Sequence, residues 1–143
     1  MNNSTKLRPF HLAIPVHDLK VARNFYSKIL GFSEGRLSDS WIDYNFFGHQ
    51  LVLHETKELT KSNKNIVDGH GVPIPHFGVV LTMEDWNTFK NKLVSKKIKF
   101  IIEPYIRFKN TNGEQATMFF LDPSGNSLEF KAFKTLKNLF KKI

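Results

Sequence analysis

Apolar and polar residues along this chain follow an order of strand-like and helix-like patterns that occurs twice. Alternating apolar positions predict strands, and apolar residues that recur every three or four positions predict a helix. Each half is predicted to contain one strand, one helix and three further strands. The predicted segments are 8–16, 18–30, 32–37, 41–47 and 50–55 in the first half, and 74–82, 84–95, 99–108, 115–121 and 127–133 in the second. The fold class is therefore predicted to be α+β, built from two βαβββ modules.

Cap and turn residues mark the limits of several segments. Asp18 is placed to cap the first helix and Gly31 to end it, while Asp122 and Gly125 belong to a strong turn signal before the last strand. Residues 56–71 are polar and lack periodicity, so they are predicted to be a linker. The chain is thus predicted to be a single domain, 1–143, with module one at 8–55, the linker at 56–71, module two at 74–133 and a helical tail at 134–143.

The tail has an apolar stripe at helical spacing, formed by Phe133, Leu136, Phe140 and Ile143. Packing of this stripe on the protein or on a partner subunit is favoured over a membrane-surface anchor, because only a few turns are available. A single pair of modules also leaves sheet edges that a second copy could cover. We therefore expect a homodimer.

The repeat places metal-ligand residue types at matching points of the two halves. His11 and His76 each open an apolar strand-like run, 65 residues apart, and residues 48–54 align with 125–131. This alignment sets Glu129 opposite Val52. If the modules pair about a pseudo-twofold axis, two histidines and one carboxylate converge, which is a metal site with open positions. A metal would also offset the cost of a carboxylate in a half-buried strand.

Composition narrows the classes of function. The chain has a formal net charge of +8 and no cysteine, which excludes thiolate ligands, a cysteine nucleophile and disulfides. The lysines lie on helix-like faces without interleaved stacking aromatics, which argues against nucleic acid and favours anionic small molecules as partners. No membrane span, secretory leader, phosphate-binding glycine loop or dinucleotide fingerprint is evident, so we expect a cytoplasmic protein.

His54 is a candidate catalytic residue. Strand alternation puts it on the same face as Val52, the repeat partner of Glu129. This face is therefore expected to point into the cavity that holds the predicted metal site. A neutral imidazole there could transfer protons to and from a substrate. A histidine bonded to water or to Glu55 is an equally weighted alternative.

Arg107 is a candidate substrate-binding residue near the end of a strand. Its guanidinium could pair with a substrate carboxylate. An ion pair with Glu103 or Glu114 is the slightly favoured alternative.

Several motifs together resemble the vicinal oxygen chelate superfamily, over residues 8–133. They are the run His-Leu-Ala-Ile-Pro-Val-His-Asp-Leu at 11–19, Phe-Tyr at 25–26, Leu-Gly-Phe at 30–32 and Asp-Pro-Ser-Gly-Asn-Ser-Leu-Glu-Phe at 122–130. The superfamily includes glyoxalase I, bleomycin-resistance proteins, fosfomycin-resistance transferases, methylmalonyl-CoA epimerase and extradiol dioxygenases. The resemblance implies a curved mixed sheet around a divalent metal in a cavity.

The resemblance implies roles for particular residues. His11, His76 and Glu129 match the metal-ligand positions, and Val52 stands where glyoxalase I and the epimerase place a fourth ligand, although Gln50 or His54 could substitute. His54 matches the catalytic histidine of extradiol dioxygenases. Phe119 stands where these enzymes have an active-site tyrosine, and we assign it to substrate binding. Fe(II) is the favoured metal, with Mn(II), Ni(II) or Zn(II) as alternatives.

These observations favour a metal-dependent enzyme that acts on a small, chelating, anionic substrate, most like an extradiol-type dioxygenase. A glyoxalase-like lyase or isomerase, or a fosfomycin-type transferase, is the alternative if the metal is redox-inactive. A non-catalytic binding protein of the bleomycin-resistance type is the alternative if no metal binds.

Overall fold

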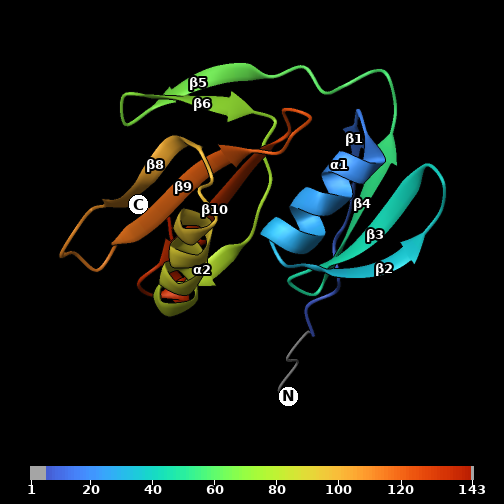
Figure 1. The fold of residues 1–143 in the computed structure, drawn as a ribbon. Coiled ribbons are helices and arrows are strands. Elements are labelled where there is room, and N and C mark those ends of the chain that lie inside the picture. Colours follow the sequence, from blue (N-terminus) through green and yellow to red (C-terminus); the bar gives the residue numbers. More distant parts are fainter. Residues whose placement is uncertain (1–5, 143) are drawn as a thin grey trace. The chain divides into compact units, whose positions relative to one another are not determined.

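The computed structural model describes residues 6–142, which form two compact units divided after Leu59. Each unit contains a mixed four-stranded sheet with a helix packed on one face (Figure 1). Within each unit the sheet and its helix follow the order strand, helix, strand, strand, strand. The predicted α+β class with two βαβββ modules is confirmed.

The first unit has its strands in the order β1-β4-β3-β2, with β1 and β4 parallel and the other pairs antiparallel. Its elements are β1 His11–Val16, α1 Leu19–Arg23, the π-helix η1 Asn24–Ile29, β2 Ser33–Leu37, β3 Trp41–Phe46 and β4 His49–Glu55. Asp18 caps α1 as predicted, because its side chain accepts a hydrogen bond of 3.0 Å from the Val21 amide.

The second unit has the order β7-β10-β9-β8, with β7 and β10 parallel. Its elements are β5 Asn63–Val67, β6 His70–Ile74, β7 Val80–Thr82, α2 Met83–Ser95, β8 Phe100–Arg107, β9 Gln115–Leu121, β10 Ser127–Phe133 and the 3₁₀ turn η2 Leu136–Asn138. β5 and β6 form a separate two-stranded sheet.

Three segments differ from the prediction. Most of the predicted linker belongs to the β5–β6 hairpin, whose turn is Asp68-Gly69 with positive φ at both residues. Asp-Gly is a favoured hairpin turn, so residues 68–69 carry a local signal for this hairpin within an otherwise polar segment. The strand predicted at 74–82 is reduced to β7 and one bridge at Phe77, since Pro75 has no amide hydrogen to donate.

The tail forms only the turn η2, because a segment this short rarely sustains an α-helix. Ile143 lies outside the described residues.

The register of the parallel pairs follows the sequence repeat. In the first unit Leu12 is level with Leu51, and in the second Phe77 is level with Leu128. These two pairs are equivalent in the alignment that matches His11 with His76 and Val52 with Glu129. The repeat therefore extends from sequence to backbone pairing.

Each helix covers the apolar face of its own sheet. Tyr26 of η1 lies against Tyr44 of β3, with ring centroids 5.7 Å apart, and Phe89 of α2 lies against Phe130 of β10 at 4.7 Å. Trp86 of α2 also donates a hydrogen bond of 2.8 Å to the Phe130 carbonyl. Because side chains alternate along a strand, Asp43 and Glu129, one residue from Tyr44 and Phe130, lie on the faces opposite the helices. No helix within residues 6–142 combines the length and apolar character needed to cross a membrane.

An ion pair connects the helix and the edge strand of the first unit. Arg23 donates two hydrogen bonds of 2.7 Å to the two carboxylate oxygens of Glu34 on β2, and the Ser27 hydroxyl donates a third. The hydrogen bonds from Arg23 and then Ser27 lower the pKa of Glu34 from 4.5 to about 2. The ionised form of Glu34 is therefore favoured in the folded state.

We predict that Glu34→Gln weakens the acid sensitivity of the fold. The stabilisation from ionised Glu34 is fully present above pH 4.5 and is lost as the pH falls from 4.5 toward about 2. The variant should be less stable than the wild type at neutral pH, and its unfolding free energy should change less over that acidic window. Urea unfolding across the window measures this. Glu58→Gln, at an exposed position after β4, is the control and should keep the wild-type slope; equal slopes for all three proteins would refute the prediction.

Candidate metal centre

His76 and Glu129 come together on the face of the second sheet opposite α2. His76 lies just before β7, and its Nε2 is 3.8 Å from Oε1 of Glu129 on β10. Both residues line a hollow of about 310 Å³, together with Gly78 and Lys131. The second unit therefore brings two of the three predicted ligands to one place.

The hydrogen bonding of His76 identifies the protonated ring nitrogen. Nδ1 lies 2.6 Å from the carbonyl oxygen of Pro73, and a carbonyl oxygen can only accept. Nδ1 therefore carries a hydrogen, and when the ring is neutral its lone pair is on Nε2, on the side of Glu129. Metal-ligating histidines commonly have their other ring nitrogen bonded to a carbonyl in this way.

Glu129 is half-buried and has polar neighbours on both oxygens. Thr117 of β9 donates a hydrogen bond of 3.1 Å to Oε2, and Lys131 Nζ lies 3.8 Å from Oε1. Thr117 and Lys131 were not predicted as site residues. Strand alternation gave a signal for Lys131, since residues 129 and 131 must share a face. The position of Thr117 depends on the β9–β10 register, which sequence alone does not give.

Phe119 is buried beside these two residues. It is level with Glu129 on β9, and its ring meets the His76 ring edge to face, with centroids 5.1 Å apart. Only 2% of the residue is exposed. This contact restricts the orientation of the His76 ring.

The third predicted ligand, His11, belongs to the first unit. It lies at the start of β1, on the face opposite α1, and its Nδ1 is 2.7 Å from Oε1 of Gln50. Within residues 6–142, no three or more histidine, aspartate and glutamate side chains are gathered as a group that could hold a metal ion. The structure thus describes a pair, His76 and Glu129, and separately an exposed imidazole on the equivalent strand of the first unit.

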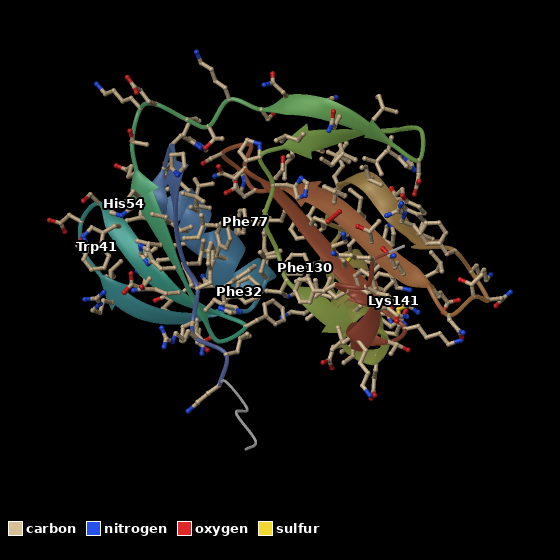
Figure 2. The ribbon with its side chains drawn as sticks, turned by 180° about the vertical axis from the view of Figure 1, so that it is seen from behind. Phe32, Trp41, His54, Phe77, Phe130 and Lys141 are labelled. Carbon is tan, nitrogen blue, oxygen red and sulfur yellow. The ribbon has the colours of Figure 1, made fainter. Side chains whose placement is uncertain are left out.

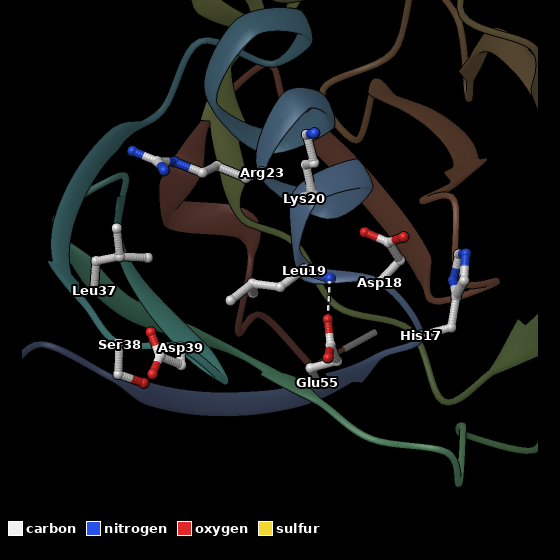
Figure 3. A pocket seen from close by; sticks show the side chains of 9 residues that line it. All are labelled: His17, Asp18, Leu19, Lys20, Arg23, Leu37, Ser38, Asp39 and Glu55. Atoms are coloured by element: carbon white, nitrogen blue, oxygen red, sulfur yellow. Dashed lines mark hydrogen bonds between the residues drawn. The ribbon is translucent and has the colours of Figure 1, made fainter.

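His54 is an exposed residue near the end of β4. It is level with Trp41 of β3 (Figure 2) and with Pro15 of β1. Alternation along β4 puts His54 on the face that also carries Val52. Glu55, its neighbour in sequence, instead accepts a hydrogen bond of 2.7 Å from the Leu19 amide at the start of α1 (Figure 3). Glu55 is thereby part of the wall of a hollow of about 450 Å³ at the start of α1.

Arg107 is engaged by the β5–β6 hairpin. Its guanidinium donates hydrogen bonds to both carboxylate oxygens of Asp68, and Tyr105 donates another to Asp68 at 3.1 Å. The ion-pair partner is thus Asp68, and the alternatives Glu103 and Glu114 were wrong. The hydrogen bond from Arg107 lowers the pKa of Asp68, whereas burial raises the pKa of Tyr105. This cluster anchors the hairpin that leads into His76.

Comparison with known proteins identifies the family. Residues 8–130 match the model of the glyoxalase/bleomycin resistance protein/dioxygenase superfamily. A crystal structure of a glyoxalase/bleomycin resistance protein/dioxygenase from Alicyclobacillus acidocaldarius is 30% identical, with a TM-score of 0.76, and the match covers 98% of this chain and 100% of that one. No curated protein matches the chain significantly.

Two less similar structures support the fold alone. A glyoxalase/bleomycin resistance protein/dioxygenase from Nocardioides is 20% identical with a TM-score of 0.63, over 91% of this chain and 87% of that one. A putative glyoxalase family protein from Bacillus anthracis is 17% identical with a TM-score of 0.62, over 94% of this chain and all of the other.

Gly78 permits the close approach of the two site residues. It lies two residues after His76, where the Phe77 carbonyl accepts a hydrogen bond of 2.8 Å from the Glu129 amide. A Cβ at residue 78 would overlap the backbone carbonyl oxygen of Glu129. Any larger residue would have to push the segment that carries His76 away from β10.

We predict that Gly78→Ala destabilises the second unit by about 1–3 kcal/mol, the usual range for overpacking. Gly113→Ala is the matched control, because a Cβ there meets its nearest atom at an ordinary 3.8 Å. The control should change stability by no more than about 0.5 kcal/mol. Urea unfolding of both variants measures the difference, and equal losses would contradict the steric explanation.

Proposed function

This chain belongs to the glyoxalase/bleomycin resistance protein/dioxygenase superfamily, and we propose that it is a divalent-metal-dependent enzyme acting on a small, anionic, oxygen-chelating substrate. The observation that carries the proposal is the pair His76 and Glu129, in which Nε2, the ring nitrogen not bonded to Pro73, faces a carboxylate across 3.8 Å in a hollow. The two units would act as one domain, since the proposed ligands come from both.

His11, His76 and Glu129 would hold the ion. Two imidazoles and one carboxylate suit Fe(II), and also accept Mn(II), Ni(II) or Zn(II). When bound, the metal would supply Lewis-acid chemistry, or redox chemistry in the case of iron. The described residues fit this group, because Glu129 has the polar neighbours Thr117 and Lys131 and because Nδ1 of His76 is bonded to a carbonyl, as in metal-ligating histidines.

The surroundings of Glu129 favour an anionic substrate. Lys131 lines the same hollow, and its ammonium group is within reach of an anionic oxygen placed beside Glu129. Phe119 would contribute an apolar wall that orients His76. Arg107 would act through its bond to Asp68, by keeping the hairpin before His76 in place.

Within the superfamily, we favour an extradiol-type dioxygenase over a four-ligand isomerase. Val52, at the position of the fourth ligand, is apolar and only 5% exposed. Gln50 cannot readily replace it, since its side-chain carbonyl oxygen is bonded to His11 and its NH₂ group to Asp43. His54, exposed on the same face, would hold or transfer the proton of a substrate hydroxyl.

Metal binding is the primary test of this function. We predict that the chain binds one divalent ion and that His11→Ala, His76→Ala and Glu129→Gln each weaken binding by more than the about 10–100-fold cost of losing an outer-shell partner. Calorimetric titration with Mn²⁺ measures this. His17→Ala is the control and should bind like the wild type. A chain that binds no divalent ion would refute the proposal and favour a non-catalytic binding protein.

For His54 we predict that replacement by Gln leaves Mn²⁺ affinity unchanged while turnover falls about 10²–10⁴-fold, the usual contribution of general acid–base catalysis. Oxygen uptake by Fe²⁺-loaded protein with carboxylated catechols is the assay. Unchanged turnover would remove His54 from the mechanism. Absence of oxygen uptake by the metal-loaded wild type would instead reject the extradiol reaction.

We also propose a homodimer. Ile101, Ile106 and Phe108 are exposed on or next to β8, which is an edge of the sheet of the second unit. Covering an apolar edge strand with a second copy would remove it from water. Light scattering at micromolar concentration should give twice the mass of 16.6 kDa, and a monomer mass would contradict the proposal.

A further inference from the structure

A chain of polar contacts runs across the first sheet and ends at His11. Arg36 of β2 and Gln50 of β4 donate hydrogen bonds of 2.9 and 3.2 Å to the same oxygen, Oδ2 of Asp43 on β3. Oε1 of Gln50 then lies 2.7 Å from Nδ1 of His11 on β1. The contacts use the face opposite the helix, where these strands are neighbours in the sheet.

The direction of each hydrogen bond follows from Asp43. Its side chain forms an ion pair with Arg36, and the oxygens of a carboxylate can only accept hydrogen bonds. Gln50 must therefore turn its NH₂ group toward Asp43, which leaves its carbonyl oxygen toward His11. That oxygen can only accept, so Nδ1 of His11 carries the hydrogen and Nε2 has the free lone pair.

We propose that Gln50, oriented by Asp43, is a positioning residue that fixes His11 in the tautomer with an unprotonated Nε2. This inference rests on the proposed function, because the tautomer matters if His11 binds a metal. In the Nδ1-protonated ring, Nε2 is the nitrogen that has a lone pair for the metal. Outer-shell partners of metal-ligating histidines act in this way. Gln50 thereby has a role other than that of a substitute ligand.

The equivalent histidine of the second unit reaches the same tautomer by another route. Nδ1 of His76 donates to the backbone carbonyl of Pro73, which no side-chain substitution removes. The tautomer of His11 should depend on residues 43 and 50, whereas that of His76 should not. His76 is therefore an internal control within the same molecule.

The test reverses the hydrogen-bond direction at residue 50. Gln50→Lys presents only donors to Nδ1, so His11 should change to the Nε2-protonated tautomer. The double variant Asp43→Asn with Gln50→Glu exchanges the amide and the carboxylate at unchanged net charge, and should retain the Nδ1-protonated form. Gln115→Lys, on β9 of the second unit, is the matched control.

Nitrogen-15 spectra of protein labelled in the histidine rings, recorded where the rings are neutral, distinguish the tautomers. We expect the His11 ring to change its tautomer in Gln50→Lys alone, while the His76 ring keeps the wild-type tautomer in all variants. An unchanged His11 in Gln50→Lys would overturn the inference, as would loss of the Nδ1-protonated form in the folded double variant. The double variant keeps the test decisive if the lysine variant does not fold.

Mn²⁺ titration of His11→Ala separates this inference from the proposed function. Unchanged affinity in that variant would show that His11 is not a ligand, and would refute the proposed metal site. The tautomer spectra would still decide whether Gln50 controls the ring.

Discussion

The parallel pairing of the first and last strand in each module is the constraint on which the candidate site depends. In a parallel pair, residues that are level with one another point to the same face of the sheet. His11 is level with Gln50, and the bridge between Phe77 and Leu128 places His76 diagonally beside Glu129. A shift of either register by one residue would send one partner into the helix-covered core. Gly78 matters for the same reason, because it lets the backbone after His76 approach β10 within hydrogen-bonding distance.

In both sheets a nearby cation compensates the charge of a largely buried carboxylate. Asp43 and Glu129 are carboxylates on the faces of the two sheets opposite the helices, with side chains 10% and 13% exposed. Each has a cationic neighbour, Arg36 and Lys131 respectively, and each touches a polar side chain on an adjacent strand. In the first unit the carboxylate of Asp43 does not touch the imidazole of His11 but is connected to it through Gln50. In the second it lies beside the imidazole, where it can serve as a ligand itself.

Much of the fold could be predicted because the periodicity of the sequence is strong and is repeated. The two modules, the cap at Asp18 and the extents of β9 and β10 follow from alternation and turn residues that act locally. The β5–β6 hairpin was missed although Asp68-Gly69 signals it, because the surrounding polar residues suggested a linker. The partner of Arg107 could not be predicted, since that hairpin brings Asp68 to β8 from 39 residues away in the sequence.

The site was predictable only as far as the repeat extends. His11 and His76 stand at matching positions and Glu129 stands opposite Val52, so alignment of the halves was sufficient to propose them as ligands. Thr117 and Asp43 have no counterpart that marks them, and their roles depend on strand register and side-chain geometry. The tautomers of the two histidines likewise require the positions of Pro73 and Gln50 in three dimensions.

Pulsed electron paramagnetic resonance of the Mn²⁺-loaded protein tests the central claim most directly, because it detects the histidine nitrogens coupled to the bound ion. Labelling the histidine rings with nitrogen-15 identifies those couplings. The account predicts couplings to two histidine rings, one of which disappears in His11→Ala and the other in His76→Ala. A spectrum that is unchanged in His11→Ala would contradict a site built from both modules.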